Sequence, residues 1–140
     1  MTRVVAFGAF DLMHPGHVFY LEEASRLGDE LIVIVARDSS IKKIKGKKPV
    51  QEQEQRLHNV LHTTGVNKAI LGSRFDPYEL IEEIRPDIIA LGYDQKVYTN
   101  NLEKQLSERG INAEVVRIQS FHPEHYKSST LRKRLLHSKD

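Results

Sequence analysis

Short apolar runs recur along the chain and alternate with segments of helical character. The apolar runs are typical of buried strands and lie at Val4–Phe7, Leu31–Ala36, Lys68–Leu71, Ile88–Leu91 and Ala113–Arg117. Helical character follows at His17–Arg26, Gln53–His62, Tyr78–Ile84, Asn101–Arg109 and Thr130–Leu136, and Gly110 is placed to end the fourth of these helices. Because strands alternate with helices, the pattern predicts βαβ units and a parallel sheet.

The predicted fold class is α/β, a Rossmann-like open parallel sheet of five strands in the order 3-2-1-4-5 with helices on both faces. Open sheets of this type bind ligands beyond the carboxyl ends of their strands, where the strand order reverses. In this order the reversal lies between the first and fourth strands. We therefore expect Gly8–His17, after the first strand, and Gly92-Tyr93-Asp94, after the fourth, to meet in one crevice.

Composition narrows the class of protein. The 140 residues fit a single domain over 1–140, with 39% hydrophobic and 29% charged residues. The absence of cysteine excludes a disulfide framework, a thiolate metal site and a cysteine nucleophile. No stretch approaches the roughly 18 apolar residues of a membrane span, and the start does not resemble a signal peptide. We expect a cytoplasmic protein without a membrane partner, and a net charge of +2 is too small to indicate nucleic acid.

The segment Gly8–His17 connects a predicted strand to a predicted helix. Amides at a helix start and the helix dipole favour phosphate there. Gly8 and Gly16 allow a ligand to approach the backbone closely, and His14 and His17 add two imidazole donors. Donors held in place at such a site stabilise the negative charge that develops during phosphoryl or nucleotidyl transfer.

The spacing His-x-x-His is by itself a weak signal. His14 could be a loop histidine and His17 a partly buried residue at the helix start. The two could also be zinc ligands, but the chain has no cysteine and shows no third ligand nearby.

Two motifs at opposite ends of the chain resemble those of one known family. His14-Pro15-Gly16-His17 and Lys127-Ser128-Ser129-Thr130-Leu131-Arg132-Lys133 are similar to the two signatures of the HxGH cytidylyltransferase-like nucleotidyltransferases. Within that family, the segments that look most like the archaeal FAD synthases are Leu31–Asp38 with Lys45–Pro49, the pair Gln55-Arg56, and Pro86–Gln95. The bacterial glycerol-3-phosphate cytidylyltransferases come next.

The resemblance implies a role for each matching residue. His14 and His17 would be catalytic. The nucleotide would be bound by Gly8, Ala9, Phe10, Asp11, His14, Pro15, Gly16, His17, Gly92, Asp94, Ser128, Ser129, Thr130 and Lys133. Lys45, Lys47 and Arg56 would lie near the second substrate, the lysines on a loop after the second strand that could act as a lid. Asp11 would lie on the metal side of the pocket and is a possible ligand of Mg²⁺, although the ion would be carried mainly by the triphosphate.

Some positions depart from the family pattern. Ala9 stands where threonine is common, and Lys127 where isoleucine is common. The Arg-Tyr-Val-Asp segment of the cytidylyltransferases corresponds to Thr64-Gly65-Val66-Asn67, which lacks the arginine. This difference weakens the match to the glycerol-phosphate enzymes.

The resemblance therefore implies an FMN adenylyltransferase that converts ATP and FMN into FAD and pyrophosphate. The alternatives are a cytidylyltransferase that uses CTP and glycerol-3-phosphate or a similar small phosphate, and a nucleotide-binding module without turnover. We also expect a homodimer. The sequence leaves open the choice of ATP or CTP and the roles of His122 and His125.

Overall fold

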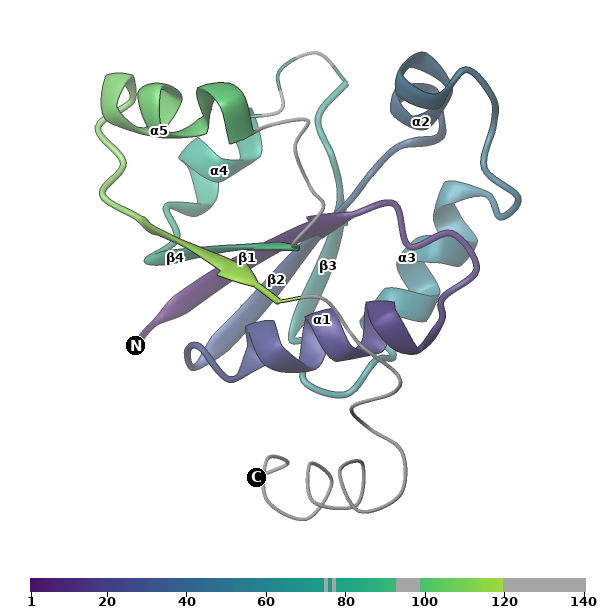
Figure 1. Ribbon diagram of the computed structural model, residues 1–140, viewed down its shortest axis with the longest axis horizontal. Helices are drawn as coiled ribbons and strands as arrows, with labels where there is room; N and C mark the ends of the chain where they lie inside the picture. Colours follow the sequence, from purple (N-terminus) through teal and green to yellow (C-terminus); the bar gives the residue numbers. More distant parts are fainter. Residues whose placement is uncertain (75, 77, 93–98, 120–140) are drawn as a thin grey trace.

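The computed structural model describes residues 1–74, 76, 78–92 and 99–119 and contains an open parallel sheet (Figure 1). Its strands are β1 (Arg3–Gly8), β2 (Glu30–Val35), β3 (Lys68–Leu71), β4 (Ile88–Gly92) and β5 (Glu114–Ile118). Their order is β3-β2-β1-β4-β5, and every neighbouring pair is parallel. The predicted fold class and strand order are confirmed.

Helices cover both faces of this sheet. The helices α1 (Pro15–Ser25) and α3 (Gln53–Leu61) lie on one face, and α4 (Glu79–Ile84) and α5 (Thr99–Glu108) on the other (Figure 1). Alternate residues of β1 supply the two cores, since Val4 packs in the cluster of α1 and α3 and Val5 in that of α4 and α5. None of the described helices is long and apolar enough to cross a membrane.

One helix was not expected from the sequence. The helix α2 (Asp38–Lys45) follows β2, in a stretch where the lysine run was expected to form a loop. Ile41 is its one buried residue, so the apolar pattern is too sparse to indicate a helix. The usable signal is Gly46, which ends the helix with φ 81° and donates its amide to the Lys42 carbonyl at 2.8 Å. The predicted helix Thr130–Leu136 lies outside the described residues.

The sheet opens at the carboxyl ends of β1 and β4. The two strands pair only as far as Ala6 and Ala90, although each continues for two residues. Beyond this point the Tyr20 hydroxyl accepts the Phe7 amide at 3.1 Å and donates to the Ala90 carbonyl at 2.6 Å. Desolvation raises the pKa of the fully buried Tyr20 phenol well above its ordinary value, so the group remains a donor. A side chain of α1 thus stands where the next hydrogen bond between the two strands would form.

The Tyr20→Phe variant tests whether this hydroxyl holds the strand ends. Removing it leaves a buried amide and a buried carbonyl without their partner, which should lower the free energy of unfolding by about 1–3 kcal/mol. Denaturant unfolding measures the loss, and amide exchange at Phe7 should accelerate. Unfolding free energy within 0.5 kcal/mol of the parent, roughly the scatter of a neutral substitution, would contradict this role.

Candidate functional site

The loop between β1 and α1 turns so that the ring of Phe10 packs against the backbone of Gly8. Phe10 is 2% exposed, and a Cβ on Gly8 would lie 2.7 Å from its ring. The close approach that Gly8 permits is therefore to Phe10, whereas the sequence suggested a ligand. Phe10 itself was expected to line the nucleotide pocket, but its ring lies in the core. It packs edge-on to His17 with centroids 5.5 Å apart and stacks with Tyr20 at 6.3 Å.

His14 and His17 hold each other at the start of α1. His14 is the N-cap residue, and its Nδ1 accepts the Gly16 amide at 3.0 Å. The His14 amide in turn donates to Nδ1 of His17 at 3.2 Å, and the two rings stack with centroids 3.8 Å apart. An Nδ1 that accepts a hydrogen bond carries no proton, so each neutral imidazole has its proton on Nε2. The backbone thereby sets both rings as Nε2–H donors.

The first amides of α1 are less available than the sequence suggested. Pro15 at the first helical position has no amide proton. The Gly16 amide is bound by the His14 side chain, and the His17 amide donates to the His14 carbonyl at 2.9 Å. The Nε2–H groups of the imidazoles are therefore more available than these amides as donors at this helix start, where the helix dipole favours an anion.

Asp11 binds the segment that follows α2. Its two carboxylate oxygens accept the amides of Val50 at 2.8 Å and Gln51 at 2.9 Å. Desolvation acts to raise the pKa of Asp11, but these two hydrogen bonds and the charges of Arg56 and Lys45 outweigh it, and the pKa lies below its ordinary value. The contribution of Asp11 to stability is therefore complete above the ordinary aspartate pKa and is lost as the pH falls through the lowered value.

The expected place of Asp11 at the metal or the nucleotide stays a prediction, and the structure adds a role as acceptor for the segment after α2. Both of its oxygens are engaged by backbone amides of the protein itself. Within the described residues there is also no group of three or more His, Asp or Glu side chains that could bind a metal ion.

Arg56 is fully buried, and its expected place near the second substrate stays a prediction. Its guanidinium donates to the Gln51 carbonyl at 3.0 Å, the Ala9 carbonyl at 2.8 Å and the Ala36 carbonyl at 2.7 Å. The remaining nitrogen pairs with Asp38 at 2.6 Å. A buried charge is tolerated only when it is paired and hydrogen-bonded. Arg56 therefore joins the ends of β1 and β2 to α3.

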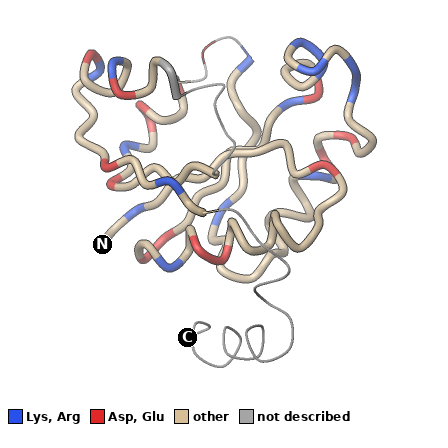
Figure 2. The backbone as a smooth tube through the Cα atoms, in the orientation of Figure 1, with Lys and Arg blue, Asp and Glu red and all other residues tan. Residues whose placement is uncertain are grey.

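The lysine-rich stretch borders this loop. Lys45 ends α2 and Lys47 follows it, and both side chains are exposed. Figure 2 shows the basic residues along α2 and the segment after it. We call the segment from Ala9 to His14, between β1 and α1, the histidine loop. Because the charge of Lys45 acts on Asp11, the lysine-rich stretch lies close enough to this loop to affect its electrostatics.

The second half of the predicted crevice is only partly described. Gly92 ends β4 at the same edge of the sheet as Gly8, and its carbonyl accepts Arg117 at 2.6 Å. Several residues named in the sequence analysis lie outside the described part of the chain: Tyr93, Asp94, His122, His125, Ser128, Ser129, Thr130 and Lys133.

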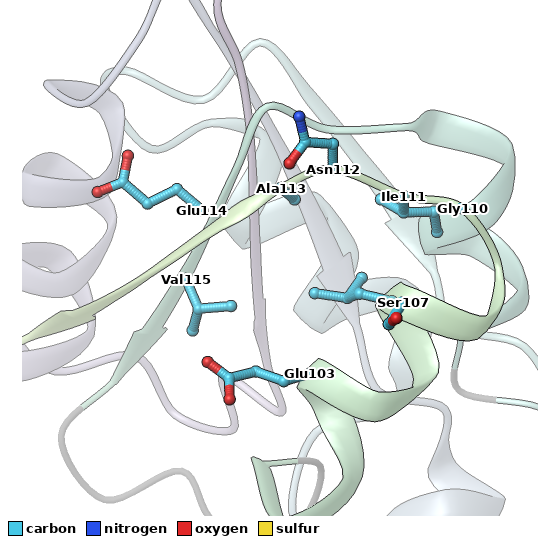
Figure 3. A pocket seen from close by; sticks show the side chains of 9 residues that line it. Glu103, Ser107, Gly110, Ile111, Asn112, Ala113, Glu114 and Val115 are labelled. Atoms are coloured by element: carbon cyan, nitrogen blue, oxygen red, sulfur yellow. The ribbon is translucent and has the colours of Figure 1, made fainter.

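A separate depression of about 750 Å³ lies between α5 and β5 (Figure 3). Its lining includes Glu103 and Glu114 and no lysine or arginine. Glu114 pairs with Ile88 at the amino end of β4, whereas the histidine loop follows the carboxyl end of β1. The depression is therefore remote from the predicted site and unsuited to a phosphate.

Sequence patterns missed two residues that shape the site, Tyr20 and Gln51. Tyr20 lies three residues after His17 among apolar helix residues, and the need of a buried hydroxyl for a partner is the only signal it offers. Gln51 lies in a polar stretch that shows no periodicity.

Comparisons with known proteins show the family of this chain. A family model described as cytidylyltransferase-like matches residues 5–134. A FAD synthase of Methanosarcina mazei is 57% identical over 84% of this chain and 77% of its own length. A FAD synthase of Methanocella arvoryzae is 51% identical over 99% of this chain and 98% of its own.

Solved structures give the same fold. A lipopolysaccharide core biosynthesis protein of Thermoplasma volcanium is 43% identical, with a TM-score of 0.82 over 87% of this chain and 99% of its own. A pantoate-beta-alanine ligase of Francisella tularensis is 16% identical with a TM-score of 0.59, covering 99% of this chain and 66% of its own. That second likeness concerns the fold alone.

Two substitutions of His14 separate its capping role from its chemistry. His14→Ala removes the cap and should lower the free energy of unfolding by about 1 kcal/mol. His14→Asn supplies a preferred N-cap side chain without the imidazole and should stay close to the parent. Denaturant unfolding of both variants measures the difference. Equal stability of His14→Ala and the parent would show that the cap contributes nothing.

Proposed function

The chain belongs to the cytidylyltransferase-like family, and from that premise we propose that it is an FMN adenylyltransferase, which converts ATP and FMN into FAD and pyrophosphate. The observation that carries the proposal is the pair of stacked histidines at the start of α1, in a chain about half identical to curated FAD synthases. The reaction class follows from the pair, and the choice of substrates from these relatives.

The histidine pair supports transfer by positioning and charge stabilisation. An oxygen of the FMN phosphate attacks the α-phosphorus of ATP. As the new bond forms, the bond from that phosphorus to the bridging oxygen breaks and pyrophosphate leaves. The Nε2–H groups of His14 and His17 are suited to donate to the phosphoryl oxygens on which charge accumulates. The attacking phosphate is already anionic near neutral pH, so no general base is required.

A magnesium ion carried by the triphosphate remains part of the proposal. Magnesium usually keeps several waters and binds substrate phosphates rather than an all-protein cage, and when bound it would neutralise part of the charge on the phosphates. The side chains described at the site fit this division of roles, because they offer imidazole and lysine donors to the phosphates rather than a set of carboxylates.

The surface beside the histidine loop favours FMN over glycerol-3-phosphate. Leu12 is 52% exposed and Val50 75% exposed, and the Asp11–Val50 and Leu12–Gln51 hydrogen bonds hold their backbones close together. Ile44, 53% exposed, lies on the adjoining α2 among the lysines. Exposed apolar side chains next to cationic ones suit a ligand with a flat apolar ring and a phosphate. Glycerol-3-phosphate has no apolar part to cover them.

The Val50→Ser variant tests this surface. If the ring of FMN covers Val50, losing the apolar contact should cost about 1 kcal/mol and raise KM for FMN roughly fivefold, with KM for ATP unchanged. Leu61→Ser is the matched control, because Leu61 is also exposed, at 46%, but ends α3 away from the loop. An unchanged KM for FMN in Val50→Ser, or an equal rise in the control, would exclude Val50 from the acceptor site.

The proposed activity is tested by pyrophosphate release with ATP or CTP, each combined with FMN, glycerol-3-phosphate or phosphocholine. We expect release with ATP and FMN, with FAD identified as the product. The His14→Asn variant serves as the control and should lose at least a hundredfold in kcat while remaining folded. Turnover of glycerol-3-phosphate without FMN would overturn the proposed acceptor, and triphosphate binding without turnover would favour a binding module.

The proposal also includes the oligomeric state of the protein and its place in the cell. The homodimer expected from the resemblance and the cytoplasmic location both stay predictions.

A further inference from the structure

Two residues of the histidine loop have a backbone conformation that L-amino acids rarely adopt. Phe10 and Leu12, on either side of Asp11, both have φ 55°. Such residues persist only where the surrounding structure enforces them, and they concentrate at functional sites. The contacts that enforce this conformation therefore influence where His14, two residues further on, is placed.

Three hydrogen bonds connect this loop to the segment after the lysine run. The Val50 and Gln51 amides donate to the Asp11 carboxylate, and the Leu12 amide donates to Oε1 of Gln51 at 3.0 Å. We call these four residues, Asp11, Leu12, Val50 and Gln51, the clasp. Because bonds run in both directions between the two segments, neither can shift along the other without breaking at least one.

Arg56 anchors both sides of the clasp. It donates to the Gln51 carbonyl on one side and to the Ala9 carbonyl on the other. This guanidinium has no exposed surface and forms an ion pair with Asp38, so its position is held firmly against the loop. The strained turn at Phe10 and Leu12 is thus enclosed by bonds at Ala9, Asp11 and Leu12.

The clasp lies between the two groups of donors that the proposed reaction would use. His14 follows Leu12 on one strand of the clasp, and Lys45 and Lys47 precede Val50 on the other. We propose that Asp11 and Gln51 are positioning residues, which hold the strained histidine loop and the lysine segment in one fixed arrangement so that acceptor and triphosphate meet in line. The proposal rests on nucleotidyl transfer at the histidine pair and not on the identity of the acceptor.

The test replaces the single side-chain bond that Gln51 makes to Leu12. Gln51→Met keeps the length of the side chain and its backbone bonds but removes the acceptor, so kcat should fall at least tenfold at saturating substrates, since small misplacements of reacting groups cost large factors in rate. Gln51→Glu restores an acceptor for the Leu12 amide, so kcat should recover to within about fivefold of the parent. Gln55→Met is the matched control, because Gln55 is exposed on α3 and its side chain donates to Asn59 on the same helix.

A second measurement does not depend on turnover. Hydrogen exchange at the Leu12 amide should accelerate at least tenfold in Gln51→Met and in neither of the other two variants, with the melting temperature preserved. If the parent fails to use FMN, the proposed function fails while the exchange result still reports on the clasp.

Three results would overturn the clasp as a positioning device. The first is an unchanged Leu12 exchange rate in Gln51→Met. The second is faster exchange with kcat within twofold of the parent. The third is a Gln51→Glu variant as slow as Gln51→Met, because the rate would then not depend on the hydrogen bond.

Discussion

The carboxyl ends of β1 and β4 are kept apart by one phenolic hydroxyl. Neighbouring parallel strands would ordinarily continue their ladder of hydrogen bonds to the end of the shorter one. Here Tyr20 accepts from one strand and donates to the other, so the Phe7 amide and the Ala90 carbonyl both have a partner although the strands have separated. The same ring stacks on Phe10, which in turn contacts His17. The opening of the sheet and the placement of the histidines therefore share a single support.

The charged and hydrogen-bonding groups near this opening suit a negatively charged ligand. The described cations include the exposed lysines on and after α2 and Arg117 at the Gly92 carbonyl, while the buried Arg56 is fully used within the protein. The histidines contribute donors whose direction is set by the backbone. A triphosphate and a phosphate-bearing acceptor would compensate the lysines, and a site of this kind gains specificity from where its donors point rather than from its net charge.

The sequence predicts the layers of this protein better than its loops. The strands and helices follow from apolar runs separated by helical segments, because strands buried on both faces of a parallel sheet are apolar along their length. The strand order came with the Rossmann-like fold class that this pattern favours. The helix α2 escaped prediction because Ile41 alone is buried in it. The hydrogen-bond partners of Asp11 and Arg56 escaped prediction for another reason. A motif gives the chemistry of a side chain, whereas the partners at Val50, Gln51 and Ala36 lie 20 to 40 positions away in the chain and become neighbours only in the fold.

The central claim is that His14 and His17 present Nε2–H groups to the triphosphate. Nitrogen NMR of the histidine side chains, with and without a non-hydrolysable ATP analogue, tests it most directly. The account predicts that both residues carry their proton on Nε2 in the free protein, and that these two Nε2–H signals shift when the analogue binds. Protons on Nδ1, or Nε2–H signals of His14 and His17 that do not move on binding, would contradict it.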